Sequence, residues 1–212
     1  MPFYEYEAKV FVENEEALTR KFRELGATLL KRILQRDSYY DLKYRLANKD
    51  ELLRIRIVEA IDTHEFQGGE FSWKSGREGK TYEVREDISI PLLTEQATHS
   101  LNEILIRLGY RKLAWLIKHR DRWRLGNVEF EFDKNIEAQA INRPKKEIGS
   151  YLQATIETEQ IHTPEQIEQI LWDSLNLLGF NSSHLRWESY VELYLIQLNE
   201  LNSFRLLKKR EI

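Results

Sequence analysis

Near its start the chain reads Glu5-Tyr6-Glu7-Ala8-Lys9. Side chains alternate between the two faces of a β-strand, so the two carboxylates and the amine of this stretch would share one face. Paired carboxylates bind hard divalent cations, and a neighbouring ammonium group binds phosphate oxygens. The stretch therefore indicates either a site for an anion with its metal ion or a strand face that is open to solvent.

The composition is that of a folded protein with many charges of both signs. Of its 212 residues, 42% are hydrophobic and 32% are charged, and the formal net charge is −3. This length is ample for a core and no linker divides the sequence, so we expect a single domain over residues 1–212 that ends in a basic tail over about 202–212. The near-neutral total argues against bulk nucleic-acid binding, which usually needs a strong basic excess.

Missing features narrow the possible functions further. The chain has no cysteine, which excludes disulfides, thiolate metal sites and a cysteine nucleophile. Its five histidines lack metal-ligand spacing, and no P-loop, GxSxG or GxGxxG motif occurs. The first residues do not form a signal peptide, and no apolar run reaches the roughly 18 residues of a membrane span. We expect a cytoplasmic protein with no membrane partner.

Helices are predicted where apolar residues recur at helical spacing between a capping residue and a glycine. Three such segments cover residues 14–26, 94–109 and 163–179. A further helix is expected over residues 187–201. The polar stretch 135–148 is expected to be a connecting loop.

Between the helices the apolar period changes to two, which is typical of strands. We count about eight such segments, including residues 53–57, 71–74, 128–133 and 149–159. Short turns such as Gly126-Asn127 join several of them, which favours antiparallel pairing. The apolar strand faces need cover, and the amphipathic helices can supply it.

The opposite strand faces carry blocks of charge. The blocks are Arg54 and Arg56; Glu83, Arg85 and Asp87; Lys118, Arg120 and Arg122; and Glu129, Glu131 and Asp133. Arginine is suited to bidentate contacts with phosphate, and about eight strands can close into a barrel wide enough for one small ligand. Two interpretations remain open at this point. The charged faces either line the interior of a barrel that binds a polyphosphate with its metal, or lie in solvent as one wet side of a sheet.

A series of motifs resembles the CYTH superfamily, the triphosphate tunnel metalloenzymes, and is closest in pattern to its thiamine triphosphatase and inorganic triphosphatase branch. In chain order the motifs are Glu5-x-Glu7-x-Lys9, residues 25–29 with 36–41, Leu53-Arg54-Ile55-Arg56, Ser72-Trp73-Lys74, Glu83-Val84-Arg85, Lys118-His119-Arg120, Glu131-Phe132-Asp133, and Ser189-Tyr190 with Glu192-Leu193. Together they span about residues 3–195. The resemblance implies an α+β fold, namely an eight-stranded antiparallel closed β-barrel, the triphosphate tunnel, with helices packed outside.

The resemblance also implies roles for individual residues. Triphosphate would be bound by Lys9, Arg54, Arg56, Lys74, Arg85, Lys118 and Arg120. Mg²⁺ or Mn²⁺ would be held by Glu5, Glu7, Glu131, Asp133 and Glu157. Tyr39 and Lys74 match the positions that help to place the attacking water.

The function implied is a divalent-metal-dependent hydrolase of linear triphosphates, inorganic tripolyphosphate or an organic one such as thiamine triphosphate, that releases orthophosphate. This agrees with the needs of phosphoryl transfer, which are positioning and charge neutralisation. Two alternatives remain: a class IV-like adenylyl cyclase that makes cyclic AMP and pyrophosphate, and a non-catalytic polyphosphate or nucleotide binder. The partner is a small-molecule triphosphate, and the protein is expected to be a monomer or a homodimer.

Two positions depart from the family pattern. Gln153 and Thr155 stand where a carboxylate is expected, so Thr155 is interpreted as a lost metal ligand. The alternative is a shifted register in which Glu157 or Glu159 fills the role. Leu52 stands where the thiamine branch carries an aromatic residue, which argues against thiamine stacking there.

Overall fold

A computed structural model describes residues 4–77, 83–158 and 163–200 of the chain. The basic tail expected over about 202–212 lies outside the described residues, and so does Glu159. Within the described part, no helix has the length and apolar character needed to cross a membrane.

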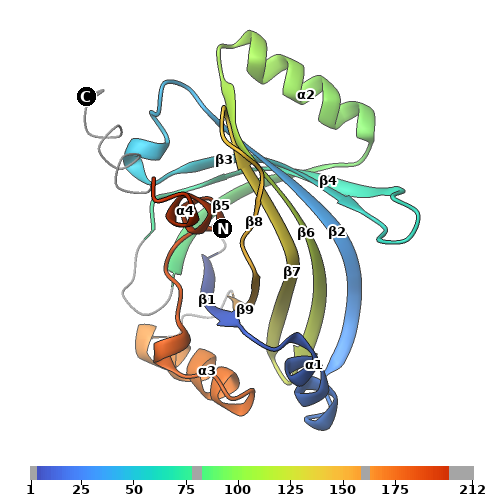
Figure 1. Cartoon of the computed structure of the whole chain (residues 1–212), viewed down its shortest axis with the longest axis vertical. Coiled ribbons are helices and arrows are strands. Elements are labelled where there is room, and N and C mark those ends of the chain that lie inside the picture. The colour runs from blue at the N-terminus through green and yellow to red at the C-terminus, as the bar shows by residue number, and fades with distance from the viewer. Residues whose placement is uncertain (1–3, 78–82, 159–162, 201–212) are drawn as a thin grey trace.

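The described strands form one antiparallel sheet (Figure 1). They are β1 (Tyr4–Val12), β2 (Thr28–Asp41), β3 (Leu52–Glu59), β4 (Phe66–Lys74), β5 (Glu83–Leu92), β6 (Arg111–Leu125), β7 (Val128–Ala140), β8 (Lys146–Glu147) and β9 (Ser150–Thr158). Their order across the sheet is β6-β2-β3-β4-β5-β1-β9-β7-β8, and β6 also pairs with β7.

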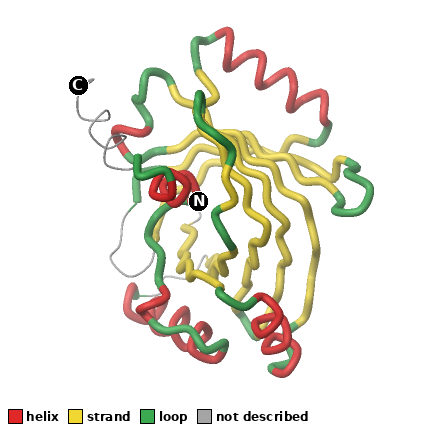
Figure 2. The backbone as a smooth tube through the Cα atoms, in the orientation of Figure 1, coloured by secondary structure: helices red, strands yellow, loops and turns green. Residues whose placement is uncertain are grey.

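The sheet is strongly curled, and its strands bend around one interior (Figure 2). The antiparallel curled sheet and the helices outside it agree with the fold expected from the sequence. Closure of this sheet into a complete barrel stays a prediction. The described pairing between β1 and β5 is short, with four register pairs from Tyr4 with Glu86 to Glu7 with Glu83.

Helices lie at the top and the bottom of the curled sheet and at its open side (Figure 1). They are α1 (Glu15–Glu24), α2 (Glu95–Arg107), α3 (Pro164–Leu177) and α4 (Tyr190–Gln197). The first three begin at the expected caps, where the side chains of Asn14, Thr94 and Thr163 each accept a hydrogen bond from a backbone N–H of the first turn.

The main core lies between helices α1 and α3 and the outer face of β1, β6, β7 and β9. Phe22 of α1 is fully buried and stacks on Trp123 of β6, with ring centroids 4.9 Å apart. Ile167, Leu171 and Leu175 of α3 fill the same cluster. This packing covers the apolar strand faces and leaves the charged faces to point inward.

Two predicted elements need correction. Residues 135–148 are not simply a loop, because β7 continues to Ala140 and β8 pairs with it. Ile136 and Ala138 are buried at strand spacing, a short apolar alternation hidden among polar residues. The last helix is shorter than residues 187–201: it starts at the Ser189 cap, and Asn199 beyond it has a positive φ of 56°.

Candidate functional site

The charged strand faces are buried in the interior of the curled sheet. Seven charged side chains from six strands are each at most 7% exposed: Lys9, Asp37, Arg54, Arg85, Lys118, Arg120 and Asp133. A sheet with one solvated face would leave such residues in water. Their burial excludes that interpretation at these positions and makes the interior the candidate site.

Asp133 lies at the centre of the largest network. Its carboxylate accepts hydrogen bonds from Lys118 Nζ at 2.8 Å, from Arg120 Nε and Nη2 at 2.6 and 2.7 Å, and from the Tyr190 hydroxyl at 2.7 Å. Burial alone would raise the pKa of Asp133, but the charges of Arg120 and Lys118 hold it well below its ordinary value of 3.8. Asp133 thus acts as a permanent counter-ion, and a metal-binding role for it stays a prediction.

Asp37 of β2 is a second buried counter-ion. Arg56 donates to both of its oxygens, from Nε at 2.8 Å and Nη2 at 2.9 Å, and Arg54 lies 3.9 Å away. Arg54 also pairs with Glu70 at 2.8 Å. Burial opposes ionisation, but the two arginines lower the pKa of Asp37 far below its ordinary range. Asp37 lies in the motif over residues 36–41 but had no predicted role. Its spacing of two from Tyr39 is a signal that puts both side chains on one strand face.

Lys118 and Tyr39 have shifted ionisation in this interior. Burial and the nearby charge of Arg120 lower the pKa of Lys118 to about 8, against the opposing pull of Asp133 and Asp37. Burial and the charge of Asp37 raise the pKa of Tyr39 to about 12. The Tyr39 hydroxyl is therefore protonated at neutral pH and can donate a hydrogen bond, but it cannot serve as a base.

Lys9 faces the same interior from β1. Its Nζ lies 5.1 Å from the centroid of the Tyr190 ring, and Lys118 Nζ lies 4.7 Å from that centroid. Among the described side chains, no carboxylate forms an ion pair with Lys9. Tyr190 of α4 belongs to the Ser189-Tyr190 motif but had no predicted role. Its ring lies beside both lysines, and its hydroxyl donates a hydrogen bond to Asp133.

Two further predicted cations are tied to neighbouring strands and loops. Lys74 of β4 pairs with Asp87 of β5 at 3.1 Å. Arg85 is buried, and its Nη1 donates to the backbone oxygens of Asp50 and Ser75 at 2.9 and 2.7 Å. Arg85 therefore holds two chain segments together at this end of the sheet, whatever else it binds.

The acidic side is connected to the cations by Gln153. Its Oε1 accepts from Arg120 Nη2 at 2.8 Å, while its Nε2 donates to the Glu7 carboxylate. Glu131 pairs with Arg120 and lies 3.5 Å from Arg122 Nε. Gln153 is thus a neutral bridge between the two charged sides of the interior.

Two predicted metal ligands are placed by their backbone alone. Glu5 of β1 is the register partner of Glu157 of β9, so the two residues share a sheet face. Thr155 pairs with Glu7 in the same ladder, which shows no shift in register at this point. Side-chain positions of Glu5 and Glu157 lie outside what the structure describes.

The acidic side has the donor chemistry for a hard cation. No group of three His, Asp or Glu side chains that could hold a metal is gathered within the described residues, since Glu7 and Glu131 are held by Gln153 and arginines. The available donors are carboxylate and hydroxyl oxygens, which suit Mg²⁺ and Mn²⁺. One of them, the buried Oγ1 of Thr155, has no hydrogen-bond partner. The residues present therefore fit a divalent cation that replaces some of these contacts.

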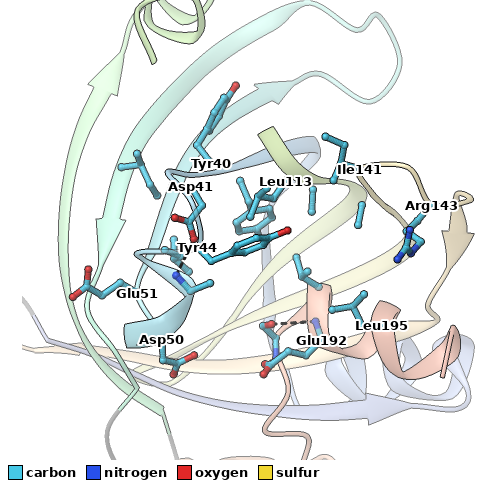
Figure 3. A pocket seen from close by; sticks show the side chains of 18 of the residues that line it. Tyr40, Asp41, Tyr44, Asp50, Glu51, Leu113, Ile141, Arg143, Glu192 and Leu195 are labelled. Atoms are coloured by element: carbon cyan, nitrogen blue, oxygen red, sulfur yellow. Dashed lines mark hydrogen bonds between the residues drawn. The ribbon is translucent and has the colours of Figure 1, made fainter. Parts of the chain in front are cut away.

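Two cavities adjoin the charged network. One, of about 410 Å³, lies at the β6–β7 hairpin and is lined by Arg122, Arg124, Gly126, Asn127, Glu129, Glu131 and Thr155. The other, of about 370 Å³, lies between α4 and the ends of β2 and β3 and is more apolar (Figure 3). In Figure 3, Glu192 and Leu195 of α4 lie across this cavity from Tyr40 and Asp41 of β2. Tyr39 and Arg85 line it as well, so it borders the interior.

Comparison with known proteins gives a family match and a fold match. The family model of the CYTH domain matches residues 4–186. No sequence among the curated proteins matches significantly.

Three solved structures illustrate the shared fold. PH1012 from Pyrococcus horikoshii OT3 is 24% identical with a TM-score of 0.69, over 89% of this chain and 98% of that one. PH1819 from the same organism is 22% identical with a TM-score of 0.71, over 91% and 99%. HpAC1 from Hippeastrum, a candidate adenylyl cyclase that reveals a dominant triphosphatase activity, is 15% identical with a TM-score of 0.58, over 93% and 96%. At these identities the likeness shows the fold.

Proposed function

This chain belongs to the CYTH domain family, and from that premise we propose that it is a divalent-metal-dependent hydrolase of linear triphosphates that releases orthophosphate. The proposal places the substrate inside the curled sheet, which would close into a tunnel around it. The physiological substrate would be inorganic tripolyphosphate or an organic triphosphate.

The observation that carries this proposal is the buried cluster of cations contributed by separate strands. Lys9, Arg54, Arg56, Lys118 and Arg120 come from β1, β3 and β6 and meet in one interior. Burying a charge is costly unless it is paired. Here the arginines and Lys118 have acidic partners, whereas Lys9 faces the Tyr190 ring. Phosphate oxygens could replace or add to these partners, because arginine binds phosphate as well as carboxylate in bidentate fashion.

The roles proposed for individual residues follow from the protonation of Tyr39 and from the contacts of Lys74 and Arg85. Tyr39 keeps its proton and would donate to a phosphate oxygen or orient the attacking water. Lys74, held by Asp87, and Arg85, held by two carbonyls, are proposed to contact the phosphates from β4 and β5.

We propose that Mg²⁺ or Mn²⁺ is held on the acidic side by Glu5, Glu7, Glu131, Asp133 and Glu157. When bound, such a cation supplies neutralisation of the phosphate charge and a lower pKa for bound water. In the structure, Gln153 contacts Glu7, and Arg120 and Arg122 contact Glu131.

The cavity beside α4 favours an organic triphosphate as a second candidate substrate. Its lining combines apolar and aromatic groups with charged ones such as Glu51 and Arg143. It shares Tyr39 with the charged interior, so a base or another ring attached to the triphosphate would have room there. Leu52 also lines it, which leaves space where an aromatic residue would stand. A nucleoside in this cavity is what a cyclase would need, and HpAC1 shows that the fold is compatible with a dominant triphosphatase activity.

One assay panel tests the proposal. The purified protein is given tripolyphosphate, thiamine triphosphate or ATP with Mg²⁺, Mn²⁺ or a chelator, and the products are separated. Orthophosphate that depends on metal supports the hydrolase. Pyrophosphate with cyclic AMP would assign a cyclase instead, and binding without any product would assign a non-catalytic binder.

A further inference from the structure

The cavity at the β6–β7 hairpin combines charges of both signs with an unpaired hydroxyl. Glu131 was expected to be a site residue from the sequence, whereas Glu129, Arg122 and Arg124 were not. A cavity with two carboxylates and two arginines matches a cation that carries an anion with it.

Thr155 points to a ligand in this cavity. The residue is 8% exposed, lines the cavity, and its buried Oγ1 has no hydrogen-bond partner. Buried hydroxyls without a partner are uncommon, because desolvating one costs free energy that no contact returns. An oxygen ligand to a cation would satisfy this group.

The strand register places two glutamates beside Thr155. Glu7 of β1 is its partner on one side, and Glu129 of β7 is its partner on the other. Directly opposed residues of antiparallel strands share a face and have Cβ atoms about 5 Å apart. Glu129 therefore stands one strand away from Thr155, within reach of the same space.

Glu129 and Glu131 are paired with arginines whose side chains are free enough to bind another anion. Glu129 pairs with Arg124 and lies 3.4 Å from Arg122, while Glu131 lies 3.5 Å from Arg122. The side chains of Arg122 and Arg124 are 40% and 53% exposed, and Arg122 Nε makes no hydrogen bond. Both arginines can turn toward a phosphate and release the carboxylates to a cation.

We propose that Glu129, Glu131 and Thr155 bind a hard divalent cation in this cavity. Glu129 supplies from β7 the carboxylate that β9 lacks at Thr155, while Arg122 and Arg124 face the phosphate that accompanies the cation. The inference deepens the proposed function and rests on it for the phosphate, whereas cation binding is measured by itself.

The first experiment is a calorimetric titration with Mn²⁺ in the absence of phosphate, with affinity and number of sites both fitted. Glu129→Gln should lose one site or weaken it by about tenfold or more. Glu137→Gln is the matched control, because Glu137 lies on the same strand and pairs with Lys145 at 2.9 Å on the surface. It should bind Mn²⁺ like the wild type. Unchanged binding in Glu129→Gln would overturn the proposal.

The second experiment moves the negative charge from position 129 to position 155. Adding Thr155→Glu to Glu129→Gln returns a carboxylate one strand away and should restore the lost site. A double variant that stays as weak as Glu129→Gln would contradict a shared cation position.

Thr155→Val guards against misfolding, because it is nearly isosteric and removes an unpaired group. Thermal stability in chelator should stay the same or rise, while Mn²⁺ affinity should fall several-fold. Unchanged affinity in this variant would also overturn the assignment. Tripolyphosphate hydrolysis is measured in parallel on the wild type. If the wild type hydrolyses tripolyphosphate but Mn²⁺ affinity is the same in the Glu129 and Thr155 variants, only this inference is wrong. If the variants change Mn²⁺ affinity as expected but the wild type hydrolyses nothing, only the proposed function is wrong.

Discussion

At the scale of single residues, buried carboxylates make a buried cation cluster possible. Asp133 is the counter-ion that Lys118 and Arg120 share, and Asp37 pairs with Arg56. Removing one member of such a network leaves an uncompensated charge in a medium that solvates it poorly. These two aspartates are therefore expected to support the fold as well as the site.

Asp133→Asn should lower the free energy of unfolding by about 3–5 kcal/mol, measured by urea denaturation. Asp173→Asn, on the exposed face of α3, is the control and should change it by less than about 0.5 kcal/mol.

Stability should also depend on pH. Folding lowers the pKa of Asp133 below 3.8, so the unfolded chain binds more protons than the folded one as the solution is acidified. Stability should fall as the pH drops below about 4, and less steeply in Asp133→Asn. An equally steep fall in the variant would contradict the assigned role.

Glu7→Gln tests the acidic side without disturbing the packing. The new amide oxygen can still accept from Gln153 Nε2, so thermal stability should be close to that of the wild type. Metal-dependent release of orthophosphate from tripolyphosphate should be abolished, because the charge that faces the cation is gone. Turnover at the wild-type rate in limiting Mg²⁺ would show that Glu7 does not face the metal.

At the scale of elements, one arginine adds a polar anchor to α4, whose apolar side chains also pack into a buried cluster. Arg77 donates to Asp50 from Nε at 2.6 Å and to Glu192 from Nη1 at 2.8 Å, and it also reaches the Trp187 backbone oxygen at 3.0 Å. Glu192 in turn completes the capping box with Ser189 at the start of the helix. The helix that carries Tyr190 into the charged interior therefore depends on this contact.

Glu192→Gln should lower the free energy of unfolding by about 1–3 kcal/mol, the scale of a lost hydrogen bond to a charged group. The control is Glu103→Gln on α2, whose pair with Arg107 is 4.0 Å long and exposed, and which should have a negligible effect. Equal losses in urea denaturation would mean that Arg77 does not anchor α4.

At the scale of the whole molecule, a chain with a formal net charge of −3 gathers several cations and their carboxylate partners in one interior. Cations meet in the interior, while the overall balance is slightly acidic. Association with a polyanion should therefore be driven by the interior and should not extend to the outer surface.

Tripolyphosphate affinity should fall steeply as salt rises, because ions screen and compete with the interior cations. Arg54→Ala should weaken binding by about 1–3 kcal/mol, the range for charge-assisted hydrogen bonds. Arg20→Ala is the control, since the Arg20 side chain on α1 is 74% exposed. Calorimetry at several salt concentrations measures both effects. Equal affinity of Arg54→Ala and the wild type would place the phosphate elsewhere.

Most helices and strands, and what each strand face carries, could be predicted from local sequence patterns. Caps such as Asn14 and Thr163 and the apolar spacing behind them predict α1 and α3, because capping and burial of one helix face are local effects. Strand alternation likewise predicts that Glu5, Glu7 and Lys9 share a face. The resemblance to the CYTH superfamily, confirmed by the family match, assigned the fold.

Where the charged faces point, and which residues meet, became clear from the three-dimensional arrangement of the strands. A period of two is the same for a solvated face and for an interior one, and the difference lies in the curl of the sheet and the pairing of β6 with both β2 and β7. Glu129 meets Thr155 through register between strands, and Asp133 meets Tyr190 across 57 residues. Such contacts between distant segments follow from packing of the whole chain and leave no local pattern in the sequence.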